Sequence, residues 1–147
     1  MPKRLEFRPT PDRQASVDCP AKITPRWGGE SRVAHCVQVS TTLPHEQAAE
    51  LLAECVVEER LAACAQVFGP VSSTYCWKGK VERAREWYCH LKTTSSRLMA
   101  LQRRIRELHP YETPEVIVVP IVDGDPSYLK WIEETVDASA TVREPRI

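Results

Sequence analysis

The stretch that decides the fold covers residues 61–94, LAACAQVFGPVSSTYCWKGKVERAREWYCHLKTT. Its β-branched and aromatic side chains predict two long strands, and the tripeptide KGK at 78–80 predicts the turn between them, with Gly79 at a position of positive φ. Gly69 followed by Pro70 predicts a bend or bulge inside the first strand, because proline cannot donate a ladder hydrogen bond. The segment therefore predicts a long antiparallel hairpin.

The returning strand of this hairpin, residues 85–93, predicts two different faces. Successive side chains of a strand point to opposite sides of the sheet. One side carries Trp87, Cys89 and Leu91, and the other carries Glu86, Tyr88, His90 and Lys92. Neither face is purely polar, and helices cover only one of them. We therefore expect a partner chain on the other face.

Helical and strand patterns flank the hairpin. Before it, residues 33–42 predict a strand, and residues 44–59 predict a helix with one apolar face. After it, a second helix is expected to end before Pro110, and the apolar run at 115–122 predicts a central, buried strand. Asp125, placed before a proline, predicts the start of a last helix. The order is β-α-β-β-α-β with an additional C-terminal helix, which predicts a ferredoxin-like fold of the α/β (α+β) class.

Length and composition predict one domain. Residues 1–32 hold five of the twelve prolines and no sustained periodicity, so we expect a disordered extension. Residues 33–138 are expected to form the domain, and residues 139–147 a frayed tail.

Charge and cysteine usage indicate the environment of the protein. The net charge is zero and the pI is about 6.9, which argues against nucleic-acid binding. No apolar run approaches the ~20 residues that cross a bilayer, and the basic N-terminus lacks the apolar stretch of a signal peptide, so we expect a cytoplasmic protein with no membrane partner. Six cysteines without CxxC spacing give no zinc motif and are expected to be reduced and mostly buried.

Three segments together resemble the CutA divalent-cation tolerance family. They are residues 61–82 (LAACAQVFGPVSSTYCWKGKVE), 91–94 (LKTT) and 109–132 (HPYETPEVIVVPIVDGDPSYLKWI), and the resemblance covers about residues 33–137. It implies a ferredoxin-like protomer, a tight homotrimer whose sheets meet edge to edge, and a cytoplasmic role in tolerance to divalent metals, copper especially. It implies no known reaction.

The resemblance also implies where copper ligands lie in some family members. They are a cysteine near the end of the first strand and two adjacent histidines before the PY dipeptide. In this chain Thr41 stands at the cysteine position, and Leu108 and His109 stand at the histidine pair. Only His109 retains a ligand side chain, so this sequence departs from the family's copper-binding set.

His109 and Glu112 lie in one short loop and form the candidate metal site. An imidazole and a carboxylate can bind Cu(II) or another divalent cation weakly, with a third ligand from a neighbouring chain or from water. The alternative is structural: His109 caps the end of the second helix and Glu112 bonds to the backbone of the turn.

A second candidate site is a pocket between subunits. Trp77 and Lys92 lie on paired strands, and with Tyr111 and Glu115 they are expected to line it, the lysine binding an anion. Alternatively, Trp77 fills the trimer interface and Lys92 pairs with a glutamate.

No paired nucleophile and base, P-loop or HExxH motif is present, so the sequence predicts a non-enzymatic protein with no catalytic residues. The alternatives to metal tolerance are a small-ligand or nucleotide sensor resembling the PII proteins, and a trimeric scaffold for partner proteins. An unidentified protein or small-molecule partner is expected in either case.

Overall fold

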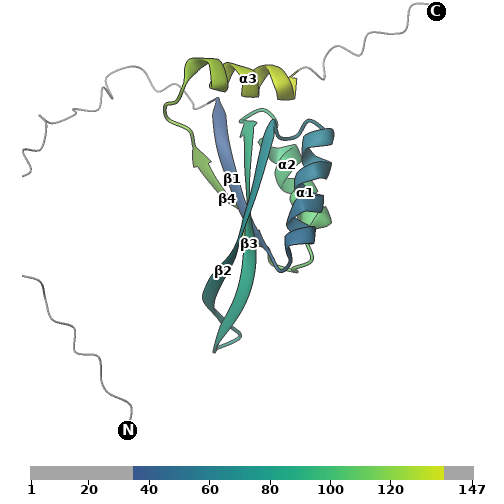
Figure 1. The fold of residues 1–147 in the computed structure, drawn as a ribbon, viewed down its shortest axis with the longest axis vertical. Coiled ribbons are helices and arrows are strands. Elements are labelled where there is room, and N and C mark those ends of the chain that lie inside the picture. Colours follow the sequence, from purple (N-terminus) through teal and green to yellow (C-terminus); the bar gives the residue numbers. More distant parts are fainter. Residues whose placement is uncertain (1–34, 138–147) are drawn as a thin grey trace, which may run out of the picture. The chain divides into compact units, whose positions relative to one another are not determined.

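The computed structural model describes residues 35–137, so the predicted extension at 1–32 and the predicted tail at 139–147 lie outside the described residues. The described part has a mixed α+β fold, in which four strands form an antiparallel sheet in the order β2-β3-β1-β4 (Figure 1). The order of elements is the predicted ferredoxin-like one. Along the chain they are β1 (Cys36–Leu43), α1 (Glu46–Glu58), β2 (Cys64–Trp77), β3 (Lys80–Thr94), α2 (Leu98–Leu108), β4 (Ile117–Pro120) and α3 (Pro126–Asp137).

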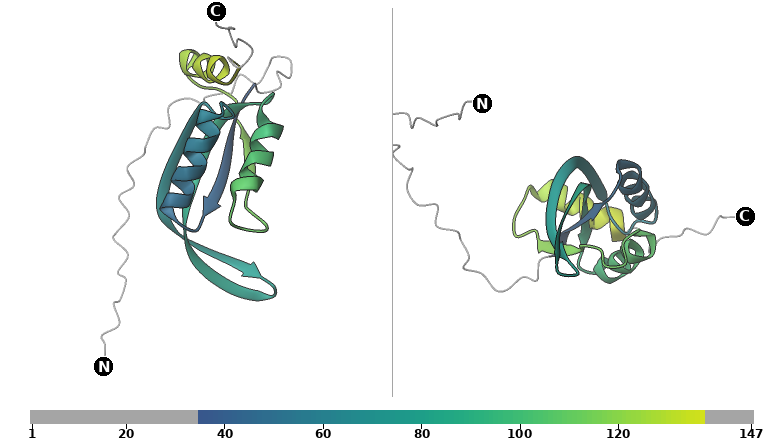
Figure 2. Two further views of the ribbon diagram at one scale, coloured as in Figure 1. Left: turned by 90° about the vertical axis from the view of Figure 1, so that its right-hand side faces the viewer. Right: turned by 90° about the horizontal axis from the view of Figure 1, so that it is seen from below.

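The hairpin predicted at residues 61–94 is present as the antiparallel pair β2–β3. Cys64 pairs with Lys92 at one end of the ladder, and Trp77 pairs with Lys80 at the other. Gly79 has a φ of 77°, as the turn requires. The turn end of the hairpin reaches well beyond the rest of the sheet (Figures 1 and 2).

The core lies between the sheet and the pair α1 and α2, which cover the same face (Figure 2). Cys89 and Leu91 of β3 point into it and are fully buried, as their alternation predicts. The helices contribute side chains at helical spacing that are at most 1% exposed: Leu52, Val56, Leu101 and Ile105.

Helix α3 closes the end of the sheet where β1 begins (Figure 1). Ile132 and Val136 of this helix pack against Cys36 and Ala63 in a smaller buried cluster. The backbone N–H of Tyr128 donates to Asp125 Oδ2 at 2.9 Å, so Asp125 acts as the predicted cap.

The prediction that residues 115–122 form a central, buried strand was wrong. The strand β4 covers only Ile117–Pro120 and lies at the edge of the sheet, beside β1. Val118 packs against the core, whereas Ile117 and Val119 are 49% and 47% exposed. The apolar run is continuous because both faces of this strand carry apolar side chains, although the described chain covers only one of them.

The side of the sheet opposite α1 and α2 is rich in aromatic rings. Phe68 stacks on Tyr88 with ring centroids 5.3 Å apart, and His90 lies edge-on to Phe68 at 4.8 Å. Phe68 is 45% exposed, and Trp77 at the far end of β2 is 46% exposed.

Within residues 35–137, no helix has the length and apolar character needed to cross a membrane.

The predicted irregularity at Gly69 is present. The β2–β3 register shifts between Phe68 and Val71, which is a β-bulge in the middle of the ladder. A Cβ at Gly69 would lie 2.7 Å from Trp87 Cδ1 and 2.9 Å from the carbonyl oxygen of Glu86. The bulge therefore brings two backbones closer than any side chain at this position allows.

We expect Gly69→Ala to lower the free energy of unfolding by about 1–2 kcal/mol, because Trp87 and the Glu86 carbonyl must both move. Chemical denaturation at fixed protein concentration measures the change. Gly124→Ala is the matched control, since a Cβ there would meet only Leu129, at 3.5 Å or more, and its φ lies outside the left-handed region. An unchanged stability in Gly69→Ala would contradict the close approach.

Candidate functional site

A cavity of about 590 Å³ lies between the β2–β3 hairpin and the loop that follows α2. We call it the acidic cavity. It receives side chains from the end of β1, from β2 and β3, and from the loop 110–115. Its lining residues are Thr42, Ser73, Tyr75, Trp77, Glu86, Pro110, Tyr111, Glu112, Thr113 and Glu115.

His109 anchors the loop that forms one wall. Its backbone is extended because the next residue is Pro110, and this ends α2. The N–H of Tyr111 donates to His109 Nδ1 at 3.1 Å, so Nε2 carries the proton and donates to the carbonyl oxygen of Thr42 at 2.9 Å. The ring is thus a structural link between α2, β1 and the loop.

Burial sets the protonation state of this ring. Only 8% of His109 is exposed, and the loss of solvent lowers its pKa, although the Thr42 carbonyl and the nearby Glu86 carboxylate act in the opposite direction. The neutral imidazole is therefore the form that the folded chain prefers.

Two hydroxyl–carboxylate hydrogen bonds hold two of the three acidic side chains of the cavity. Tyr111 donates its hydroxyl to Glu86 Oε2 at 3.0 Å, and Thr42 donates to Glu115 Oε2 at 3.1 Å. Burial, followed by the bond to Glu86, raises the pKa of Tyr111 to about 12. The phenol consequently remains a proton donor at neutral pH.

The structure brings most of the predicted pocket residues together. Trp77, Tyr111 and Glu115 line the acidic cavity, and so does Glu112 of the candidate metal site. Lys92 does not reach it within one chain, because it pairs with Cys64 at the opposite end of the ladder and its Nζ donates to the side-chain oxygen of Gln66.

Two aromatic or acidic residues of the cavity, Glu86 and Tyr75, were not among the predicted site residues. Both lie on the hairpin. One signal in the sequence could have identified Glu86. The alternation of side chains along residues 85–93 places this acidic residue on a face of the strand that was expected to be covered. Glu86 is only 7% exposed.

The residues at the family's copper positions do not fit a copper ion. Thr41 is fully buried in the core, and its Oγ1 has no hydrogen-bond partner among the described residues. Leu108 packs against the core and has no donor atom. The Nδ1 lone pair of His109 accepts a hydrogen bond, so this ring could ligate a cation only by giving up a structural bond. Within residues 35–137, no three His, Cys, Asp or Glu side chains gather as a metal site.

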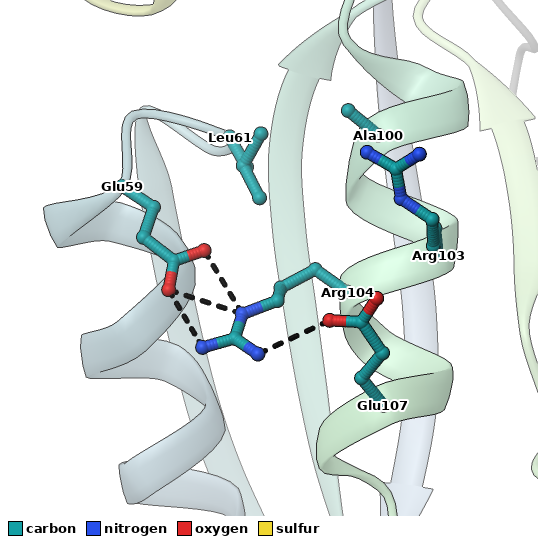
Figure 3. Close-up of a pocket in the computed structure, with 6 residues that line it drawn as sticks. All are labelled: Glu59, Leu61, Ala100, Arg103, Arg104 and Glu107. Atoms are coloured by element: carbon teal, nitrogen blue, oxygen red, sulfur yellow. Dashed lines mark hydrogen bonds and ion pairs between the residues drawn. The ribbon is translucent and has the colours of Figure 1, made fainter.

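A smaller hollow, of about 270 Å³, lies between the end of α1 and α2 (Figure 3). Arg104 neutralises the two carboxylates in this hollow. Its guanidinium contacts both carboxylate oxygens of Glu59 at 2.8–3.0 Å and one of Glu107 at 3.2 Å. Because these partners are half-exposed, the cluster ties the two helices together only weakly. It leaves no carboxylate there without a cation.

The fold and the cavity together define the class: a ferredoxin-like domain with open sheet edges and a ligand-sized cavity beside its hairpin. Residues 33–135 match the family described as "CutA1 divalent ion tolerance protein". The chain therefore belongs to the CutA1 divalent ion tolerance family.

Individual relatives agree with this assignment. The Thermus thermophilus divalent-cation tolerance protein CutA is 40% identical over 96 residues, which are 65% of this chain and 93% of the relative. The mouse protein CutA is 42% identical over 97 residues, but the match spans only 55% of that longer protein. The crystal structure of CutA from Xylella fastidiosa superposes with a TM-score of 0.69 at 37% identity, over 70% of this chain and 99% of that one. A similar structure from Archaeoglobus fulgidus, with a TM-score of 0.67 at 35% identity over 69% of this chain and 98% of that one, is described as periplasmic.

Proposed function

We propose that this chain acts in divalent-cation tolerance as a non-catalytic, cytoplasmic homotrimer, with the acidic cavity lying at the surface between subunits. The family assignment supports the role in tolerance. The five described cysteines are free thiols, which is typical of a reducing compartment. In this proposal, His109 and Glu112 contribute at most weak binding of Cu(II) or a similar ion.

The observation that carries the trimer is the pair of open sheet edges. β2 and β4 each pair with only one neighbour in the described chain. Exposed apolar side chains accompany both edges, among them Ile117 and Val119 on β4 and Trp77 on β2. A contact between the β2 edge of one copy and the β4 edge of the next uses two different surfaces, and three such contacts can close a ring.

This assembly also bears on the predicted pocket. Trp77 lines the acidic cavity and is 46% exposed, so a neighbouring copy that packs on the hairpin would cover the cavity mouth. Lys92 would have to come from another copy to reach the cavity. The predicted inter-subunit pocket thus requires the trimer.

We expect light scattering on the purified chain to give about three times the 16.7 kDa of one chain, with no fall in mass on dilution to micromolar concentration. Val119→Lys places a charge on the exposed face of β4 and should lower the mass to that of smaller species. Met99→Lys is the matched control, because Met99 is an exposed apolar residue on α2, 83% accessible and away from both edges. A folded single chain at micromolar concentration would overturn the proposal.

A further inference from the structure

The acidic cavity gathers carboxylates that form no ion pair within the described chain. Glu86, Glu112 and Glu115 line it, and none of them takes part in the ion pairs found within residues 35–137. Glu86 is more than nine-tenths buried, and its described partner is the neutral hydroxyl of Tyr111. A buried carboxylate without a positive partner is costly, so this arrangement favours a cation from outside the chain.

Three aromatic side chains also face the cavity. Tyr75, Trp77 and Tyr111 all line it. The face of an aromatic ring attracts a cation that lies within about 6 Å of its centre, and tryptophan does so best. The chain shows this preference itself, since Lys78 Nζ lies 5.9 Å from the centre of the Trp77 ring.

The arrangement of the carboxylates favours an organic cation over a metal ion as the ligand. A compact metal ion needs several ligands within a few ångströms, and the described residues contain no such group of three. A volume of about 590 Å³ is in the range of cavities that hold small organic molecules. Aromatic rings together with a carboxylate counter-ion are the groups that recognise an ammonium ion carrying carbon substituents.

We propose that the acidic cavity binds a small organic ammonium ion, with the Glu86 carboxylate as counter-ion and the rings of Trp77 and Tyr75 as its walls. This deepens the function proposed above, because it assigns a ligand class to the same cavity. Glu112 and Glu115 add negative charge at the rim, which raises the local concentration of cations.

The test uses the full chain in its native assembly and a matched pair of probes. Choline carries a quaternary ammonium, and 3,3-dimethyl-1-butanol has the same shape without the charge. n-Butylammonium and putrescine complete the panel. We expect calorimetry and tryptophan fluorescence at low ionic strength to show at least one ammonium probe bound, with the neutral alcohol weaker by roughly ten-fold or more.

Two variants assign the binding to the cavity. Glu86→Gln keeps the shape and the bond from Tyr111 but removes the charge, so ammonium affinity should fall by roughly ten-fold or more at unchanged melting temperature. Glu82→Gln is the control, because Glu82 is an exposed residue of the same strand that does not line the cavity. Trp77→Leu, which removes a ring and no charge, should weaken choline binding as well.

Four results would overturn the proposal. The first is the absence of binding across the ammonium panel, and the second is equal binding of choline and its neutral isostere. The third is equal binding by Glu86→Gln. The fourth is binding that appears only in Lys92→Met, which would show that a lysine of another copy already fills the cavity. Light scattering on the same samples keeps these outcomes separate from a failure of the trimer, since mass and ligand affinity are measured independently.

Discussion

Leu52→Ala should lower the free energy of unfolding by about 2–5 kcal/mol, which is a large part of the stability of a domain of this size. Leu52 is 1% exposed on the inner face of α1 and belongs to the main core cluster. Truncating it removes apolar surface from the core and leaves a cavity between the helix and the sheet. Denaturant unfolding followed by circular dichroism measures the loss.

The neighbouring leucine is the control. Leu51 lies on the same helix turn but is 60% exposed, so Leu51→Ala should change stability by about 0.5 kcal/mol or less. Both variants have to be measured at one protein concentration, because assembly contributes to apparent stability. Equal losses in the two variants would mean that α1 packs with a different face against the sheet.

His109→Ala is expected to cost roughly 2–3 kcal/mol of stability. The substitution leaves the carbonyl oxygen of Thr42 and the N–H of Tyr111 without their partner in a largely buried place. His45→Ala, at an exposed position before α1 where the side chain makes no cap bond, should have a small effect. A lower free energy of unfolding in His109→Ala, with Cu(II) binding unchanged, would show that the ring stabilises the loop and does not bind the metal. A stability equal to the parent would contradict that role.

The same residue gives a pH dependence with a definite sign. The folded chain depresses the pKa of His109, so the unfolded chain takes up the proton first, near pH 6.5. This contribution to stability is complete above that pH and is lost as the pH falls toward the lower folded pKa. The difference in unfolding free energy between pH 7.5 and 5.5 should therefore shrink in His109→Gln, and an unchanged difference would count against the buried neutral ring.

The acidic cavity shows how far sequence reasoning reached. Trp77, Tyr111 and Glu115 were predicted to share a pocket and do line one cavity. Glu112, predicted for the metal site, lines it too, although the sequence could not show that the hairpin lies beside the loop 110–115. Lys92 was placed with them because its strand pairs with that of Trp77. Strand pairing brings together only residues at matching register, and these two lie at opposite ends of the ladder.

Glu86 marks the limit of local patterns. Alternation along β3 places it on the face opposite Cys89, but the same pattern fits a solvated glutamate equally well. Its burial depends on Tyr111, which is 25 residues away in sequence and arrives on a loop held by His109. Contacts of that kind depend on where α2 ends. The alternation of side chains along one strand therefore cannot predict them.

The sequence alone determined the order of elements, the hairpin turn at Gly79 and the bulge after Phe68, because each rests on the conformational limits of a few neighbouring residues. It also determined which faces of α1, α2 and β3 are apolar, since periodicity follows from helix and strand geometry. Only the tertiary structure decided that β4 is an edge strand and that both ring nitrogens of His109 form hydrogen bonds with the backbone. It also decided that Glu86 shares one cavity with three aromatic side chains. The physical reason is that burial and hydrogen-bond partners are set by elements distant in sequence, whose relative positions no local propensity fixes.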